Sequence, residues 1–362
     1  MVPASGAAPS LVQNDSGSTA RKGGQVAQFA LRRTLFAIPT LIIISLILFT
    51  IIDLAPGDPT SQLPLTVPEE QRAMIREMLG ANDPFFIRWL TWLKLTFINE
   101  PLHLIDRWFG VCIADCESRI ISWNTRGPVT DVIYQRLPQT LWVLGLAFVF
   151  GSILAIPVGV YSAYKQYSLF DNVGTIITTI GFSAPTFFTG LAAIVIFSVK
   201  LKWLPSFYKT THDVDFTDWS SIWFQIKQMI MPVAVLTLFN AAALSRFTRA
   251  AVLDNLNADY VRTARAKGTS ERKVVTTHVM RNSMIPVVTL IALAIPSIFG
   301  GAIITEQIFK VNGLGQLLIV SIGNGDLPTV QTLTFAFAVL TVVFNLIADL
   351  MYGVLDPRIR YD

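Results

Sequence analysis

Six apolar segments dominate this chain of 362 residues, and each is long enough to cross a lipid bilayer as a helix. A membrane-spanning helix needs about 20 apolar residues, and its backbone polar groups must be satisfied within the segment. Only 14% of the residues are charged, and the mean hydropathy is +0.53. We therefore predict an all-α, polytopic membrane protein with six spans, at residues 34–54, 138–161, 173–199, 230–252, 284–305 and 333–355.

The connections between these spans differ in positive charge, and the difference predicts the orientation. Residues 246–281 carry eight Lys and Arg, whereas residues 306–332 carry only Lys310. Cytoplasmic connections are enriched in Lys and Arg, so 246–281 and both termini are predicted to be cytoplasmic and the long segment 55–137 extracytoplasmic. Because residues that flank spans explain the net charge of +4, membrane lipid is an expected partner and nucleic acid is not.

Two regions outside the spans have their own character. Residues 1–30 are rich in Ser, Gly and Ala and lack apolar periodicity, which predicts a disordered cytoplasmic tail before a membrane domain at 31–362. Within the extracytoplasmic segment, helical spacing of apolar residues predicts one short helix at 69–80 and another at 85–97.

The only two cysteines, Cys112 and Cys116, lie in the segment that is predicted to be extracytoplasmic. A disulfide is permitted on that side of the membrane, and a four-residue spacing could close a small loop. If the segment is helical, the two residues are instead ordinary buried thiols. No metal site is expected there, because the set of ligands is too small.

The stretch DYVRTARAKGTSERKVV, at 259–275, predicts a helix, a glycine turn and a second helix on the cytoplasmic side. The first helix begins after Asn257 or Asp259 and ends at Gly268, where a left-handed backbone costs little. Thr269 or Ser270 can cap the second helix. A narrow, charged helix held on two spans suits insertion into a cleft of a cytoplasmic partner. The alternative is a basic loop that fixes topology and touches lipid head groups.

Irregular and charged positions in the spans suggest where a solute passes. Pro185 is expected to kink the third span, and Gly190 allows close helix approach, so both mark either a translocation path or ordinary packing. Asp53 and Asp349 lie near span ends and lack a basic helical neighbour in the sequence. The third and fifth spans contain no ionisable residue, which argues against a proton or sodium relay.

Several motifs, in order along the chain, carry a family resemblance. Residues 262–268, RTARAKG, occupy the frame of the cytoplasmic coupling loop of ABC-importer permeases, in which Glu-Ala-Ala is followed by three residues and Gly. The chain thus resembles the dipeptide/oligopeptide group of these permeases, of the first-permease type, from about residue 31 onward. Arg262 and Thr263 depart from the usual Glu and Ala, and residues 111–126 lie outside the family pattern. The remaining matching motifs are LAPGDP (54–59), APTFFTGL (184–191), LKWLP (201–205), RNSMIPVVT (281–289), FKVNGLGQLL (309–318) and DPRIRY (356–361).

The resemblance implies a permease of the cell inner membrane whose coupling loop, 254–283, transmits ATP-driven movement. Its implied partners are a second permease subunit, two cytoplasmic ATPase subunits and an extracytoplasmic solute-binding protein. The chain has no G-x-x-x-x-G-K-[ST] phosphate cradle, so we expect no enzyme activity and no cofactor on it, and we expect ATP and magnesium on the ATPase. The residues implied to couple to the ATPase are Asp259, Arg262, Ala264, Arg265, Lys267 and Gly268.

The substrate and the energy source leave alternatives open. The resemblance implies transport of peptides, but the same family also carries nickel, oligosaccharides and opines, and no residue in the sequence discriminates among them. The rival classes are an ion-coupled secondary transporter and a membrane scaffold or channel. An ion-coupled transporter would work from an ion gradient without ATPase subunits, and a scaffold or channel would show no ATP-dependent uptake.

Overall fold

The computed structural model describes residues 16–55, 60, 66–78, 80, 82–110, 119–209, 214–300 and 303–355. The described residues form helices, joined by turns and one isolated bridge between Ile121 and Pro128. The predicted all-α class is therefore confirmed. The α-helices are α1 (Ser16–Asp53), α2 (Glu69–Met78), α3 (Phe85–Lys94), α4 (Glu100–Phe109), α5 (Val129–Thr140), α6 (Leu146–Tyr164), α7 (Leu169–Ser183), α8 (Thr186–Ala193), α9 (Trp219–Leu256), α10 (Asp259–Ala266), α11 (Glu271–Lys273), α12 (Met280–Gly300), α13 (Ile303–Phe309), α14 (Leu314–Gly323) and α15 (Leu327–Leu355).

Four π-helical stretches continue or join these helices. In a π-helix each N–H bonds to the carbonyl five residues back, which widens the turn. The stretches join α3 to α4, join α5 to α6, extend α8, and join α11 to α12. They are η1 (Leu95–Asn99), η2 (Leu141–Gly145), η3 (Ile194–Lys200) and η4 (Val274–Val279).

Five helical segments are long and apolar enough to cross a membrane, and a bent pair of helices makes a sixth. The six predicted spans are confirmed on this basis, although several helices run beyond the predicted bounds. The five long segments are Leu31–Asp53, Val129–Tyr164, Trp219–Leu256, Glu271–Pro296 and Leu327–Asp349, and the bent pair is Leu169–Ser183 with Thr186–Lys200.

The first helix differs from the sequence prediction at its N-terminal end. α1 begins at Ser16, so residues 16–30 are helical rather than part of a disordered tail. Once the membrane-spanning part of α1 has formed, each added residue only propagates an existing helix, which costs far less than starting one. Residues 1–15, the rest of that predicted tail, lie outside the described residues.

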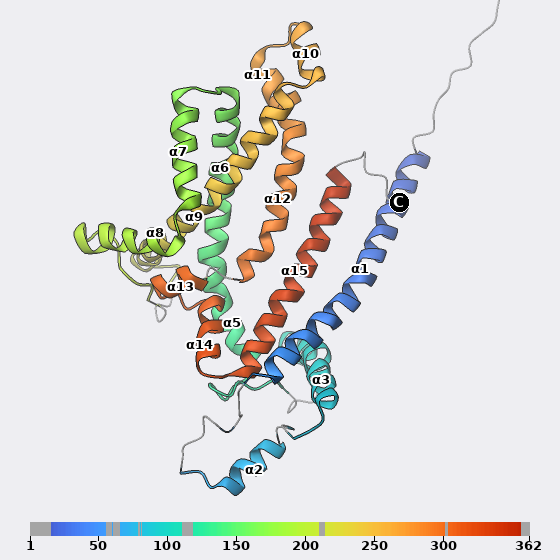
Figure 1. Ribbon diagram of the computed structural model, residues 1–362, viewed down its shortest axis with the longest axis vertical. Coiled ribbons are helices and arrows are strands. Elements are labelled where there is room, and N and C mark those ends of the chain that lie inside the picture. Colours follow the sequence, from blue (N-terminus) through green and yellow to red (C-terminus); the bar gives the residue numbers. More distant parts are fainter. Residues whose placement is uncertain are drawn as a thin grey trace, which may run out of the picture.

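The third span is broken rather than gently kinked. Ser168 starts α7 with its hydroxyl accepting the backbone N–H of Asp171, and α7 ends at Ser183. Pro185 disfavours a helical conformation at Ala184, whose backbone is extended with φ −74° and ψ 125°. The helices on the two sides of this break meet at 103°, so α8 lies across the end of α7 (Figure 1).

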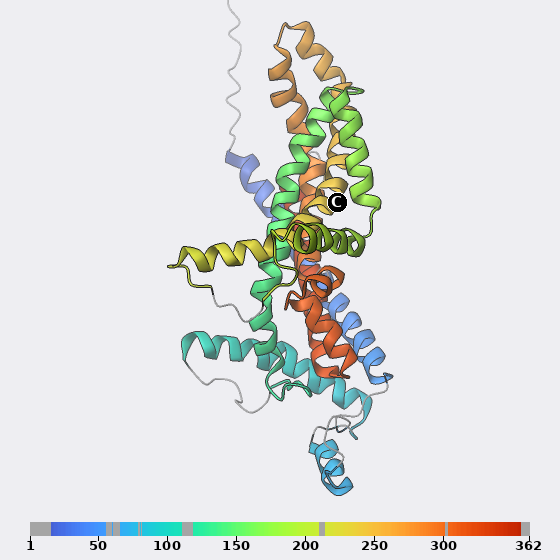
Figure 2. The ribbon, with the colours of Figure 1, turned by 90° about the vertical axis from the view of Figure 1, so that its left-hand side faces the viewer.

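The centre of the bundle is the contact between α6 and α9, which run side by side (Figure 1). Small residues permit this close approach: a Cβ on Gly159 would lie 2.6 Å from the carbonyl oxygen of Ser245. α9 contains Pro232, and its first part runs sideways out of the bundle (Figure 2). Proline is a common cause of such a bend because it removes a helix hydrogen bond.

The two ends of the molecule are built differently. α10 and α11 form a small turn at one end, whereas α2, α3 and α14 lie at the other (Figure 1). α1 and α15 run alongside each other between the ends, and Arg33 pairs with Asp349 at 3.2 Å. Arg88 of α3 pairs with Asp53 at the end of α1 at 2.5 Å. Both aspartates therefore have basic partners, which come from neighbouring elements and not from their own helices.

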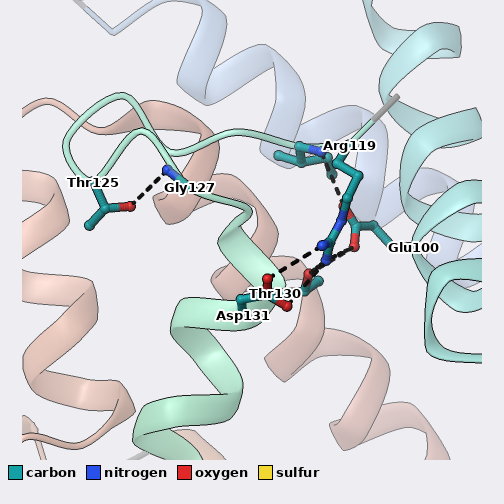
Figure 3. Close-up of polar contacts among 7 residues, drawn as sticks. Glu100, Arg119, Thr125, Gly127, Thr130 and Asp131 are labelled. Carbon is teal, nitrogen blue, oxygen red and sulfur yellow. Dashed lines mark hydrogen bonds and ion pairs between the residues drawn. The ribbon is translucent and has the colours of Figure 1, made fainter. Parts of the chain in front are cut away.

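A buried polar cluster organises the end opposite α10. Glu100 of α4 accepts the backbone N–H of Ile120 at 3.1 Å and the Thr130 hydroxyl at 2.8 Å, and Arg119 lies 3.3 Å away (Figure 3). Arg119 also reaches Asp131 at 3.4 Å. These bonds attach the chain around residue 120 to α4 and α5.

A second carboxylate fixes the same segment to α15. Asp326, just before the start of α15, accepts hydrogen bonds from the Ser122 hydroxyl at 2.5 Å and from the Trp123 backbone at 2.9 Å. It also accepts from Thr329 in the first turn of α15. Its oxygens thus contact the first turn of α15 and also hold a segment about 200 residues earlier in the chain.

Candidate functional site

The helix α10 connects two of the long helices at one end of the bundle. Ala258, in an extended conformation, separates it from α9, and no side chain caps its N-terminus. The chain then turns and starts α11 after Ser270, which is also extended. The predicted helix, glycine turn and second helix are all present. We call residues 257–273 the α10–α11 turn.

Gly268 ends α10 in the conformation that the sequence predicts. Its φ is +76°, in the left-handed region, and nothing lies within 4 Å of the position that a Cβ would take. The N–H of Thr269 bonds to the carbonyl of Ala264 at 3.2 Å, and the N–H of Gly268 bonds to that of Arg265 at 2.9 Å. These bonds satisfy carbonyls that the end of the helix would otherwise leave open.

The inner face of α10 is part of a small apolar core. Val261 is fully buried and Ala264 is 7% exposed. Both pack with Val252 of α9, with Val274 and Val279 of η4, and with Ala163 of α6. A displacement of α10 is therefore transmitted by direct packing to the helices that continue into the bundle.

The outer face of α10 is charged and exposed. Arg265 makes two hydrogen bonds to Glu271 across the turn, at 3.1 and 2.7 Å, and the bonds raise its already high pKa further. Arg262 and Asp259 lie 3.7 Å apart, with 72% and 98% of their side chains exposed. Lys267 is exposed as well. The α10–α11 turn thus exposes charged side chains at this end of the bundle.

Comparison of the sequence with known protein families shows which family contains this chain and its α10–α11 turn. Residues 155–361 match the family described as "Binding-protein-dependent transport system inner membrane component", and residues 26–144 match its N-terminal region. The chain belongs to this family. It is a multi-pass inner-membrane permease, the membrane component of an ABC importer, and the ion-coupled alternative is not favoured.

Individual relatives agree with this assignment over their whole length. The permease is 38% identical over 337 residues to the oligopeptide transport system permease protein AppB of Bacillus subtilis (strain 168), covering 93% of this chain and 100% of the relative. It is 33% identical over 334 residues to the glutathione transport system permease protein GsiC of Salmonella choleraesuis (strain SC-B67), covering 92% and 99%. The structural match to a solved amino acid ABC transporter covers 62% of this chain and 94% of the transporter chain, with a TM-score of 0.48 and 12% identity. This match adds nothing to the assignment.

The residues that were predicted to couple to an ATPase fall into two groups, one exposed and one buried. Asp259, Arg262, Arg265, Lys267 and Gly268 are exposed on the α10–α11 turn. Ala264 belongs to the buried face described above and does not reach the surface that a partner would touch. Its place is inside the turn, where it sets the distance between α10 and η4.

The two positions that were predicted to mark a translocation path also differ. Pro185 stands at the break between α7 and α8. Gly190 is buried, and a Cβ there would lie 3.3 Å from the ring of Phe309 and 3.5 Å from Ile308. Gly190 thus permits close packing of α8 on α13. Cys112 and Cys116, the predicted disulfide, lie outside the described residues.

Besides Glu100 and Asp326, sequence reasoning missed two buried carboxylates that lie just outside the predicted spans. Asp171, two residues before the third span, makes two hydrogen bonds to Arg249 of α9, at 2.7 and 2.9 Å. Glu306, one residue after the fifth span, accepts the N–H of Gln316 at 2.8 Å and the Thr140 hydroxyl at 3.3 Å. Both carboxylates occur beside apolar runs, and that position was the available signal.

Proposed function

We propose that this permease moves peptides, or small solutes related to peptides, and that α10 is the docking element for a cytoplasmic ATPase subunit. Oligopeptides and glutathione appear in the names of relatives that match the chain over nearly their full length. The proposal also includes a second permease subunit, a second ATPase and an extracytoplasmic binding protein. ATP and magnesium are bound by the ATPases.

One observation carries the proposed docking role. α10 combines an exposed, charged outer face with a buried apolar face that is packed on helices continuing into the bundle. A partner that moves α10 therefore moves the ends of α9 and η4 as well. Such a unit suits the rigid-body switching by which inward-open and outward-open states interconvert.

The proposed orientation follows from charge. The α10–α11 turn lies in the region with eight Lys and Arg, and cytoplasmic connections are enriched in these residues. The proposal therefore places the turn and both termini in the cytoplasm and the segment 55–137 outside. Peptide delivery by a binding protein would then occur at the end that carries α2 and α3.

The test is the substitution Gly268→Asp, assayed in the complete transporter. A side chain at a positive φ costs on the order of 1 kcal/mol, which a large bundle tolerates. The added carboxylate stands on the exposed turn and should prevent docking. We expect normal membrane abundance, loss of ATP-dependent peptide uptake and weak recovery of the ATPase on purification.

Two control variants separate docking from backbone strain. Gly110→Asp places the same side chain at a helix end with φ +66° and open surroundings, but at the other end of the molecule, and it should retain uptake. Gly268→Ala introduces the strain without the charge and should lose much less activity than Gly268→Asp. Full uptake by an abundant Gly268→Asp protein would overturn the docking role of α10.

A further inference from the structure

An apolar groove of ≈ 600 Å³ lies among α6, α7 and α9. α7 approaches its neighbours at glycine positions, such as Gly174, where a Cβ would lie 3.4 Å from the Ser162 hydroxyl. The lining of the groove includes Val173 and Ile177 on α7 and Leu154 on α6. Apart from Thr178 and Ser245, the lining side chains carry no polar group, so the groove offers almost nothing to a hydrogen-bonding ligand.

A smaller polar cavity of ≈ 140 Å³ adjoins this groove. The two spaces share Val158, Gly174, Thr178 and Ser245 in their linings. The cavity adds Ser162, Thr175, Arg246 and Arg249 to the lining residues. An apolar groove thus continues into a polar cavity with two cationic side chains.

The charges at this cavity do not balance. Arg249 binds Asp171 through Nε and Nη2, at 2.7 and 2.9 Å. Arg246 lies 5.5 Å from the ring centroid of Phe182 and has no ion pair to a carboxylate of the described residues. Two guanidinium groups and one carboxylate leave one net positive charge, which a single phosphodiester would balance.

The cavity lies toward the end of the bundle that carries the α10–α11 turn. α6 ends at Tyr164 and α7 begins at Leu169, so the turn between these helices lies beside the cavity residues Ser162 and Gly174. With the proposed orientation, this is the cytoplasmic side. The cytoplasmic leaflet carries anionic lipids, which attract Lys and Arg near the surface.

We propose that the groove and the cavity together hold one anionic phospholipid. An acyl chain lies along the groove, and the phosphodiester contacts Arg246 and Arg249. An extended peptide would bring backbone polar groups to a wall that cannot satisfy them, whereas an acyl chain brings none. A helix of a second permease, about 10 Å across with its side chains, would lie over the groove rather than within it. The inference goes beyond the proposed transport function and uses only its orientation.

The experiment measures lipid retention by the complete transporter complex. The purified complex is exchanged into nanodiscs that contain equal amounts of palmitoyl-oleoyl phosphatidylglycerol and phosphatidylcholine, and lipids that remain bound after mild detergent extraction are counted by native mass spectrometry. One cationic side chain near a lipid surface is worth about fivefold in affinity. We expect about that preference for phosphatidylglycerol in the wild-type complex and its loss in Arg246→Gln.

Matched variants identify the site. Arg281→Gln removes one positive charge from an exposed residue of the same end without touching the cavity, and it should keep the preference. Val173→Trp fills the groove and should lower retention of both lipids, whereas Val195→Trp adds the same bulk on an exposed part of η3 and should not. Size-exclusion elution and basal ATPase activity verify that each variant complex is assembled.

Several outcomes would overturn the proposal. Equal retention of the two lipids, or an unchanged preference in Arg246→Gln, excludes the cationic cavity as the headgroup site. Displacement of the bound phosphatidylglycerol signal by inorganic phosphate alone identifies a free-anion site instead. Cross-linking of the Val173→Cys variant to the second permease would show that a helix covers the groove. If Arg246→Gln impairs uptake of free peptides but not of amidated peptides, with lipid retention unchanged, the cavity belongs to the substrate. The lipid measurement does not depend on peptide uptake. Failure of the lipid proposal can therefore be distinguished from failure of the proposed transport function.

Discussion

Charged residues gather at both ends of the helical bundle, and the two ends expose them very differently. At the α10–α11 turn, Arg262 and Asp259 keep 72% and 98% of their side chains exposed. At the opposite end, Glu100 keeps 8%, and Asp326 as a whole residue is 2% exposed. The exposed pair costs little to hold and leaves its charges available to a partner. The buried carboxylates persist only because each has several donors, and they make that end a rigid unit.

The largest expected effect concerns which membrane side each end faces. In a variant without Cys112 and Cys116, a single cysteine at Ser270 or at Thr66 is exposed to a membrane-impermeant thiol reagent in intact cells. We expect labelling at position 66 and none at position 270, because positive charge keeps the α10–α11 turn in the cytoplasm. Permeabilised cells, in which both positions should react, are the control. The reverse pattern would contradict the orientation on which the comparison rests.

The next effect compares the same chemical change at the two ends. Glu100→Ala removes one of the acceptors of Arg119 and leaves the N–H of Ile120 and the Thr130 hydroxyl without the carboxylate that accepts from them in a buried cluster. Removing one partner from such a cluster costs about 3 kcal/mol. Glu271→Ala breaks only the exposed pair with Arg265 and should cost less than about 1 kcal/mol. Thermal unfolding of the two purified variants measures both losses, and similar values would show that the ends are not different in kind.

A smaller effect separates the two faces of α10. Ala264→Leu places three more carbons in the tight core under α10, and overpacking of this kind costs typically 1–3 kcal/mol. We expect a lower unfolding temperature and a larger loss of uptake, because α10 must shift from η4. Ala266→Leu adds the same side chain on the exposed face and is the control. Equal behaviour of the two variants would mean that the buried face does not position α10.

The smallest effect concerns the ion pair between the long helices. Arg33 and Asp349 lie 3.2 Å apart, with 52% and 35% of their side chains exposed. Exposed pairs of this kind are worth less than about 1 kcal/mol. Asp349→Asn should therefore leave stability and ATP-dependent uptake nearly unchanged. Abolished uptake by a stable Asp349→Asn protein would instead assign this carboxylate an essential role in transport.

The sequence predicts the local features of this protein well because those features depend on neighbouring residues. The apolar runs give the spans, Pro185 gives the position, although not the size, of the bend in the third one, and Gly268 gives the end of α10. Each signal acts within a few residues of its own position in the chain. That is why both the six spans and the shape of the α10–α11 turn follow from pattern alone.

The polar contacts between helices could not be predicted in the same way. Asp171 is hydrogen-bonded to Arg249, which lies 78 residues later in the chain. Asp326 is hydrogen-bonded to Ser122, which lies 204 residues earlier. The same difficulty affects α10, where the helical spacing groups Tyr260, Ala264 and Lys267 on one face. The structure buries Ala264 and exposes the other two, because the direction of the core is set by the helices packed beneath and not by the spacing.

The π-helical stretches have a consequence for the length of the chain. A π turn holds about one residue more than an α turn, so a helix can accommodate an extra residue there without losing its continuity. η2 lies within the second span, and η4 lies between α11 and α12. A deletion of one residue in η4 can thus be repaired by a return to ordinary α-helical winding. Because the widened turn alone holds the extra residue, its loss would leave α10 and its charges facing nearly the same direction. The same deletion within α12 would instead rotate α10 by roughly 100° about the axis of α12, one residue's share of a 3.6-residue turn. η4 is therefore a place where this permease can change in length without turning its charged turn away.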